Sequence, residues 1–135
     1  MRALALDANA LISLFDGDDE VRDAMAMAEK IYIPAIALGE ILLGFNETKR
    51  GRAARKALDA LMELPCVEVL PVGCETASCF ATIFRYLKEQ GQPIPQDDLW
   101  IAANVLETGA VLFTRDEHLT RIPMIRVLPS VLSKK

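Results

Sequence analysis

Four carboxylates of this chain stand where folding alone gives little reason for a charge, the first three among apolar neighbours and the last just past an apolar segment: Asp7, Glu40, Asp98 and Asp116. Asp7 ends a short apolar run, Glu40 lies inside a nearly uncharged segment, and Asp98 opens a stretch that carries no other charge up to residue 106. A carboxylate in such surroundings must be solvated, paired or bound to a cation, because burying it alone costs several kcal/mol or drives it to the neutral form. Four such groups indicate one shared cation.

The elements that must position these carboxylates are short strands that alternate with helices. Strands are expected at residues 2–6, 31–33, 67–70, 110–114 and 124–128, and helices at 10–15, 18–30, 35–45, 48–64, 74–90 and 98–108. Such alternation is typical of an α/β domain with a parallel sheet. We therefore expect a three-layer α/β/α fold around a five-stranded, mainly parallel sheet, with residues 1–135 forming a single domain.

Three of the carboxylates lie at strand or helix ends that such a sheet can bring together. Asp7 ends the first strand, Asp116 lies just past the fourth, and Asp98 begins the helix that leads into the fourth strand. If the first and fourth strands are neighbours, these three carboxylates meet at the carboxyl ends of the strands, where α/β sheets bind ligands. Glu40 joins them if its helix leans across. Carboxylates so close together repel one another, and a bound Mg²⁺ or Mn²⁺, which prefer oxygen ligands, would relieve this repulsion. The predicted chemistry is metal-dependent hydrolysis of phosphodiester bonds.

Each carboxylate also has a purely structural interpretation. Either Asp7 or Asn9 can cap the first helix, and either Asp97 or Asp98 can cap the helix that ends at residue 108. Glu40 can be an exposed helix residue, and Asp116 can be a turn residue. The prediction of a cation site therefore rests on the set of four and not on any single member.

Composition restricts the cofactor and the cellular setting. The formal net charge of −4 does not indicate nucleic-acid binding, although a cation held by carboxylates can itself meet a phosphate. No apolar run approaches the roughly 20 residues of a membrane helix and no signal-peptide pattern is present, which predicts a cytoplasmic protein with no membrane attachment. Cys66, Cys74 and Cys79 lack the spacing of a zinc site and are expected to be buried thiols.

Other charged residues are ascribed to the surface. Five basic residues gather at the start of the helix expected at 48–64: Lys49, Arg50, Arg52, Arg55 and Lys56. The simpler interpretation is a solvated helix face, and the alternative is a patch that positions RNA phosphates. Arg115 is expected to pair with an acidic neighbour. The single histidine, His118, is too little for a histidine-based metal centre and is expected in a turn, where an acid or base role is the less favoured interpretation.

Four segments carry the carboxylates in a distinctive order and spacing: Leu6–Asn9, Pro34–Gly44, Ile94–Ala103 and Gly109–His118. In this combination the chain resembles the PIN-domain ribonucleases, and most closely the VapC toxins of type II toxin–antitoxin modules. The resemblance covers essentially the whole length. It implies a PIN-like fold, a homodimer, Mg²⁺- or Mn²⁺-dependent cleavage of RNA (often tRNA or rRNA), and silencing by a cognate VapB-like antitoxin.

The resemblance also assigns roles to residues. The acidic quartet that it implies around the metal consists of Asp7, Glu40, Asp98 and Asp116. Asp7 and Asp98 match the most direct metal ligands, and Asn9 and Thr114 match polar positions beside those ligands. An endoribonuclease toxin is the function that follows from this match.

Two residues depart from the family's pattern, and three other functions stay open. Ala8 and Ala37 stand where a hydroxyl residue is common, so metal binding or substrate positioning is expected to be weaker. A phosphatase of the haloacid dehalogenase type would need an aspartate where Asn9 stands. A housekeeping RNA-processing nuclease and a non-catalytic PIN-like interaction module are the remaining alternatives.

Overall fold

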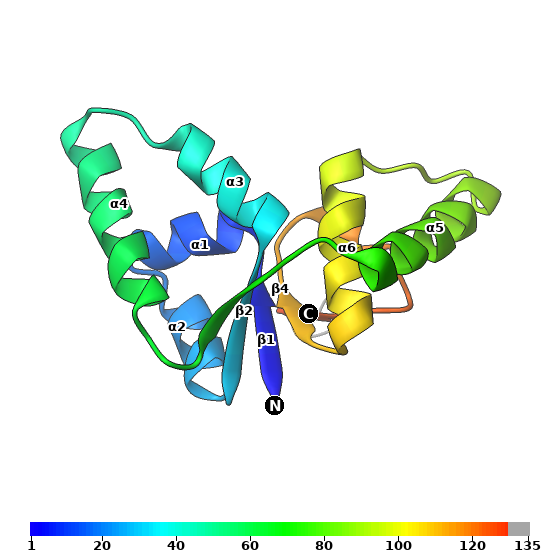
Figure 1. Ribbon diagram of the computed structural model, residues 1–135, viewed down its shortest axis with the longest axis horizontal. Coiled ribbons are helices and arrows are strands. Elements are labelled where there is room, and N and C mark those ends of the chain that lie inside the picture. Colours follow the sequence, from blue (N-terminus) through cyan, green and yellow to red (C-terminus); the bar gives the residue numbers. More distant parts are fainter. Residues whose placement is uncertain (130–135) are drawn as a thin grey trace.

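A five-stranded sheet forms the centre of the protein, as a computed structural model that describes residues 1–129 shows (Figure 1). Its strands are β1 (Ala3–Leu6), β2 (Lys30–Pro34), β3 (Val67–Leu70), β4 (Val111–Phe113) and β5 (Arg126–Leu128). They run in the order β3-β2-β1-β4-β5, and every neighbouring pair is parallel. The predicted five-stranded sheet is confirmed, and it is parallel throughout.

Seven helices are packed on the two faces of this sheet. They are α1 (Ala8–Phe15), α2 (Asp19–Ala26), α3 (Ala35–Gly44), α4 (Lys49–Met62), α5 (Cys74–Glu89), α6 (Gln96–Thr108) and α7 (Glu117–Thr120), counted over residues 1–129. Helices α1, α2 and α4 contribute to the apolar core on one face, and α5, α6 and α7 contribute to the core on the other. The result is the three-layer α/β/α arrangement that the sequence predicts.

The two cores follow from the alternation of side chains along the central strand. Leu4 and Leu6 of β1 belong to the core under α1, α2 and α4, whereas Ala5 belongs to the core under α5 and α6. All three are fully buried, as expected for a strand that is covered on both faces. Helix α3 reaches both cores, through Ala37 on one side and Ile41 on the other. It thereby bridges the layers at the carboxyl edge of the sheet.

Two helices begin earlier than the sequence predicts. Helix α1 starts at Ala8 and not at residue 10, because Asp7 and not Asn9 is its cap. Helix α6 starts at Gln96 with Pro95 in the cap position, so neither Asp97 nor Asp98 is a cap. Proline fits the start of a helix because its fixed φ suits that position and it lacks an N–H group that would need a partner. Both aspartates of α6 therefore lie in its first turn.

The expectation of buried cysteines is wrong. Cys66 and Cys74 are exposed and Cys79 is only partly buried. Cys66 precedes the edge strand β3 and Cys74 opens α5, and the ends of elements at a sheet edge are poorly covered by other layers. Among residues 1–129, no helix is both long and apolar enough to cross a bilayer.

Candidate metal centre

Asp7 and Thr114 lie side by side at the carboxyl edge because β1 and β4 are neighbours. Leu6 pairs with Phe113, so the residues that follow both strands emerge together. Asp7 is 4% exposed and caps α1, its Oδ1 accepting a hydrogen bond of 2.8 Å from the N–H of Ala10. The helix cap and membership of the acidic site are thus not alternatives for Asp7, since one carboxylate does both.

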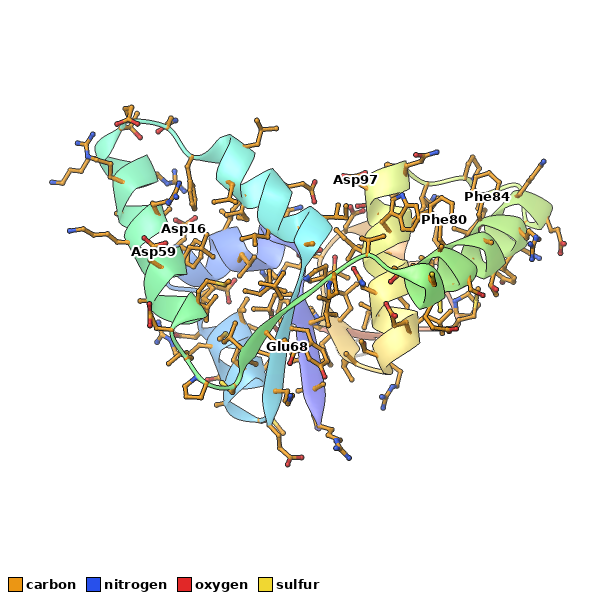
Figure 2. All side chains as sticks on the ribbon, in the orientation of Figure 1. Asp16, Asp59, Glu68, Phe80, Phe84 and Asp97 are labelled. Carbon is orange, nitrogen blue, oxygen red and sulfur yellow. The ribbon has the colours of Figure 1, made fainter. Side chains whose placement is uncertain are left out.

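Asp98 approaches Asp7 from the first turn of α6. Its side chain is 13% exposed, whereas Asp97 beside it is exposed. Figure 2 shows Asp97 at the start of α6, on the side that faces α3. Because Pro95 occupies the cap position, the Asp98 carboxylate is not used to cap α6 and is available to the site.

Asp116 is held at the site by the short helix α7, which it caps. Its Oδ1 accepts a hydrogen bond of 2.9 Å from the N–H of His118. The Oγ1 of Thr114, which is 2% exposed, accepts a 3.0 Å hydrogen bond from the N–H of Asp116. Thr114 thus fixes the direction in which the chain leaves β4. Asp116 is at once a turn residue and a member of the acidic group.

These carboxylates surround one pocket of about 260 Å³ at the carboxyl edge of the sheet. The residues that line it come from four parts of the chain: Asp7, Ala8, Asn9, Glu40, Pro95, Asp97, Asp98, Ile101, Asp116 and His118. Glu40 reaches the pocket from an exposed position in the middle of α3, which begins directly after β2 at the carboxyl edge of the sheet (Figure 1). The structure therefore brings together all four carboxylates selected from the sequence, with Asn9 on the wall.

The crowding of carboxylates raises their pKa values. Burial, followed by the charges of Asp116 and Asp97, raises the pKa of Asp98 from 3.8 to about 7. Partial loss of hydration at the pocket wall, hydrogen bonding to Asp97 and the charges of Asp97, Asp98 and Asp7 raise the pKa of Glu40 from 4.5 to about 7. Burial also raises the pKa of Asp7, an effect that the neighbouring Thr114 hydroxyl and Ala10 N–H oppose. At neutral pH the site holds more negative charge than its surroundings stabilise.

The donors present fit a divalent cation. Oxygen atoms of Asp98 and Asp116 and a nitrogen of His118 all lie within 4.8 Å of one another, and Asp7 and Glu40 line the same pocket. The Nδ1 atom of His118 is buried and has no hydrogen-bond partner among residues 1–129. Unneutralised carboxylates beside an unpartnered buried nitrogen are the features that a bound cation would resolve.

Sequence reasoning missed two of these residues, His118 and Asp97. The sequence predicts His118 in a turn without a role at the site, but α7 turns its ring towards Asp116 and Asp98. The signal that could have found it is the spacing Asp116-Glu117-His118, because an aspartate that caps a helix lies close to the residue two positions later. The sequence offers Asp97 only as a possible cap, and in the structure Asp97 raises the pKa of Glu40 more than any other carboxylate does.

The two alanines that depart from the family pattern, Ala8 and Ala37, differ in whether they line the acidic pocket. Ala8 lines the acidic pocket, so a missing hydroxyl there is missing from the site itself. Ala37 is fully buried in the core and does not line the pocket. The first departure bears directly on the site, whereas the second is accommodated by packing.

The basic residues are engaged mainly by contacts within the protein. Arg50 pairs with Asp16 at 2.9 Å, and the guanidinium of Arg55 lies 6.0 Å from the centre of the Phe45 ring. Arg52 donates a hydrogen bond to the carbonyl of Glu47. Such exposed pairs contribute little to stability. They are consistent with the solvated helix face that the sequence favours.

Arg115 does pair with acidic residues, but they belong to α2 and its cap. It lies 3.0 Å from Asp18 and 2.7 Å from Glu20, and its guanidinium is 5.1 Å from the centre of the Phe113 ring. These contacts tie the segment after β4 to the opposite layer. They help to hold Asp116, the next residue, at the edge of the sheet.

A second, apolar groove adjoins the acidic pocket. It measures about 300 Å³ and lies between α1, α3 and α4, with Ile12, Phe15 and Phe45 among its walls. Ala8 and Glu40 line both the groove and the acidic pocket. Any chain segment that filled the groove would therefore reach the edge of the carboxylate site.

The parallel sheet and the acidic pocket at its carboxyl edge are the features expected of a PIN domain, and comparison of the sequence with known families gives the same result. The sequence model of the PIN domain matches residues 4–124, and the chain belongs to that family. It is 24% identical over 96 residues to Ribonuclease VapC4 of Mycobacterium tuberculosis, covering 71% of this chain and 74% of that protein.

Solved structures share the fold. A VapBC2 structure from Rickettsia felis, bound to a promoter DNA fragment, matches with a TM-score of 0.79 at 20% identity, over 93% of this chain and 96% of that one. A DNA-bound VapBC structure from Salmonella typhimurium matches with a TM-score of 0.79 at 23% identity, over 94% and 97% of the two chains. Because the chain belongs to the PIN family, the alternative of a haloacid dehalogenase phosphatase is excluded.

Proposed function

We propose that this protein is an endoribonuclease that hydrolyses RNA phosphodiester bonds with Mg²⁺ or Mn²⁺, and that it acts in the cytoplasm as the toxin of a toxin–antitoxin pair. The observation that carries the proposal is the convergence of Asp7, Glu40, Asp98 and Asp116 on one pocket, where two of their pKa values are raised to about 7. The name of the relative Ribonuclease VapC4 supports RNA as the substrate.

In this proposal Asp7 and Asp98 hold the cation most directly, and Glu40 and Asp116 complete the negative wall of the pocket. When bound, a divalent cation activates water and stabilises charge on a phosphate. The N–H of Ala10 fixes the direction of the Asp7 carboxylate, so that little freedom is lost on binding. Asn9 and Thr114 are proposed to support these ligands, Asn9 from the pocket wall and Thr114 through the backbone of Asp116.

Cleavage of RNA by purified protein tests the proposal. We expect cleavage that requires Mg²⁺ or Mn²⁺ and is abolished by EDTA. It should fall at least about 100-fold in Asp98→Asn, because this variant lacks a carboxylate that holds the cation, and the cation stabilises the charge on the phosphate in the transition state. Asp59→Asn removes the same charge from an exposed position of α4 (Figure 2) and should cleave like the wild type. Full activity in a folded Asp98→Asn protein would refute the proposal, and Mn²⁺ binding without any cleavage would favour a non-catalytic interaction module.

Growth of cells that express the protein separates a toxin from a housekeeping nuclease. A toxin should arrest growth, Asp7→Asn should relieve the arrest, and co-expression of the small protein encoded beside it should do the same. Solved structures that share the fold include a member of the VapBC family of toxin–antitoxin systems and a toxin–antitoxin complex, which supports such a partner. Expression without any effect on growth would favour the housekeeping alternative. A homodimer is proposed from the family resemblance, and its mass in solution is the test.

We propose the apolar groove between α1, α3 and α4 as the surface that the antitoxin covers, because Glu40 and Ala8 line both the groove and the acidic pocket. Ile12→Glu places a charge on the groove wall and should leave RNA cleavage intact but prevent silencing. Leu43→Glu is the matched control, since Leu43 is 88% exposed and lies outside the groove lining. Normal silencing of Ile12→Glu would place the antitoxin elsewhere.

A further inference from the structure

His118 is the only histidine of the chain, and its ring is turned towards the acidic pocket. The Nδ1 atom lies 3.1 Å from Oδ1 of Asp116 and 3.5 Å from Oδ2 of Asp98. The atom is buried, and no group in residues 1–129 makes a hydrogen bond with it. An ordinary pair of imidazole and carboxylate would satisfy this nitrogen with a hydrogen bond, and here the orientation does not provide one.

The distances between the donor atoms are those between ligands of one small cation. When ligands stand at about 2.1 Å from an ion in octahedral geometry, neighbouring ligands are about 3 Å apart. The two distances from Nδ1 of His118 are close to this value, and the donor atoms of His118, Asp98 and Asp116 all lie within 4.8 Å of one another. One ion can therefore contact all three side chains without a large movement of any of them.

The backbone holds His118 in this position. Its own N–H donates to Oδ1 of Asp116, the same oxygen that lies near its ring nitrogen. Leu119, the next residue of α7, is 1% exposed and anchors the helix in the core. The ring is thus carried by a fixed turn of helix and not by a free loop, which is the condition for a preorganised ligand.

We infer that Nδ1 of His118 is a ligand of the cation and that it makes the site prefer Mn²⁺ to Mg²⁺. The inference rests on the metal site of the proposed function and adds a ligand that differs from all the others in chemistry. Mg²⁺ is bound almost wholly by oxygen, whereas imidazole nitrogen binds transition ions well. A neutral imidazole also adds a donor without adding negative charge to a crowded set of carboxylates.

Pulsed electron paramagnetic resonance of Mn²⁺ bound to the tag-free protein tests the inference. The echo should carry the modulation of a directly bound ¹⁴N nucleus, and it should change to the ¹⁵N pattern in protein grown with ¹⁵N-histidine. Because the chain has a single histidine, the signal identifies the residue without any mutation. In calorimetric titrations, His118→Gln should weaken Mn²⁺ binding about tenfold and Mg²⁺ binding less than about threefold.

The neighbouring Glu117→Gln variant is the control, because Glu117 lies on the same short helix but is exposed and does not line the pocket. It should retain the nitrogen modulation and the Mn²⁺ affinity. Mn²⁺ that binds to the wild type without nitrogen modulation would overturn the role of His118 and leave the proposed ribonuclease intact. Absence of any Mn²⁺ binding would overturn both.

Discussion

Replacing Asp98 with asparagine should stabilise the protein when no metal is bound. The pKa of Asp98 is raised from 3.8 to about 7 by burial and by the charges of Asp116 and Asp97. The folded protein therefore binds this proton more tightly than the unfolded chain does. For this group, stability is greatest below about pH 4, falls as the pH rises towards 7, and is lowest above pH 7. Asparagine removes the charge and nearly keeps the shape.

The size of the effect follows from the same pKa values. A rise from 3.8 to about 7 corresponds to about 4 kcal/mol, at about 1.4 kcal/mol per pKa unit. The pocket opens to solvent, which screens the charges, so we reduce the expected gain to about 2 kcal/mol at pH 8. In a chain of this length, that gain raises the melting temperature by about 6–10 °C.

Urea unfolding in EDTA, at pH 8 and pH 4, measures the difference between Asp98→Asn and the wild type. We expect a gain of about 2 kcal/mol at pH 8 that nearly disappears at pH 4, where both proteins carry a neutral group at this position. Asp59→Asn controls for the change in net charge. An Asp98→Asn protein that is no more stable than the wild type at pH 8, or equally stabilised at both pH values, would refute the proposed repulsion.

Two further predictions concern the same site. Thr114→Val should lower stability by about 1–3 kcal/mol in thermal unfolding, because the partly buried N–H of Asp116 loses its acceptor on the buried Thr114 side chain. Thr114→Ser should retain most of the stability, and equal stability of the valine variant and the wild type would contradict the prediction. The affinity for Mn²⁺ should rise with pH and level off above about pH 7, because protons and the cation compete for Asp98 and Glu40. An affinity that is constant from pH 5 to 8 would show that the cation binds elsewhere.

The sequence predicts the fold and the set of carboxylates well, because both depend on local patterns. Alternating apolar segments identify all five strands within a few residues, and a charge such as Asp7 at the end of a buried strand is conspicuous. The adjacency of β1 and β4 depends instead on contacts between segments more than 100 residues apart, which only the fold settles. From the sequence, the meeting of the carboxylates depends on this adjacency, and in the structure β1 pairs with β4.

Helix starts were predicted less well because several residues competed for one role. Pro95 takes the cap position of α6, which moves Asp98 into the first turn and makes it available to the pocket. The sequence offers Asp7 as either a helix cap or a ligand candidate, but one oxygen bonded to Ala10 does not prevent the carboxylate from facing the pocket. Neither outcome follows from residue preferences alone, since the choice depends on where the preceding chain comes from.

The exposure of the cysteines and the neighbours of His118 do not follow from the sequence for a common reason, which is that the surroundings of a side chain depend on distant segments. Frequencies indicate that a lone histidine in a turn is solvated, yet α7 is anchored by Leu119 and carries His118 over the pocket. Frequencies also indicate buried thiols, yet Cys66 lies beside an edge strand that no further strand covers. The sequence identifies which residues could do chemistry, and the packing decides which of them meet.

Calorimetric titration of the metal-free protein with Mn²⁺ at pH 7.5 tests the central claim, that carboxylates from separate elements share one cation. We predict that the wild type and Asp59→Asn bind Mn²⁺ alike, and that Asp7→Asn and Asp98→Asn, each shown to be folded by circular dichroism, bind it at least about tenfold more weakly. Unchanged Mn²⁺ affinity in both Asp7→Asn and Asp98→Asn would contradict the claim.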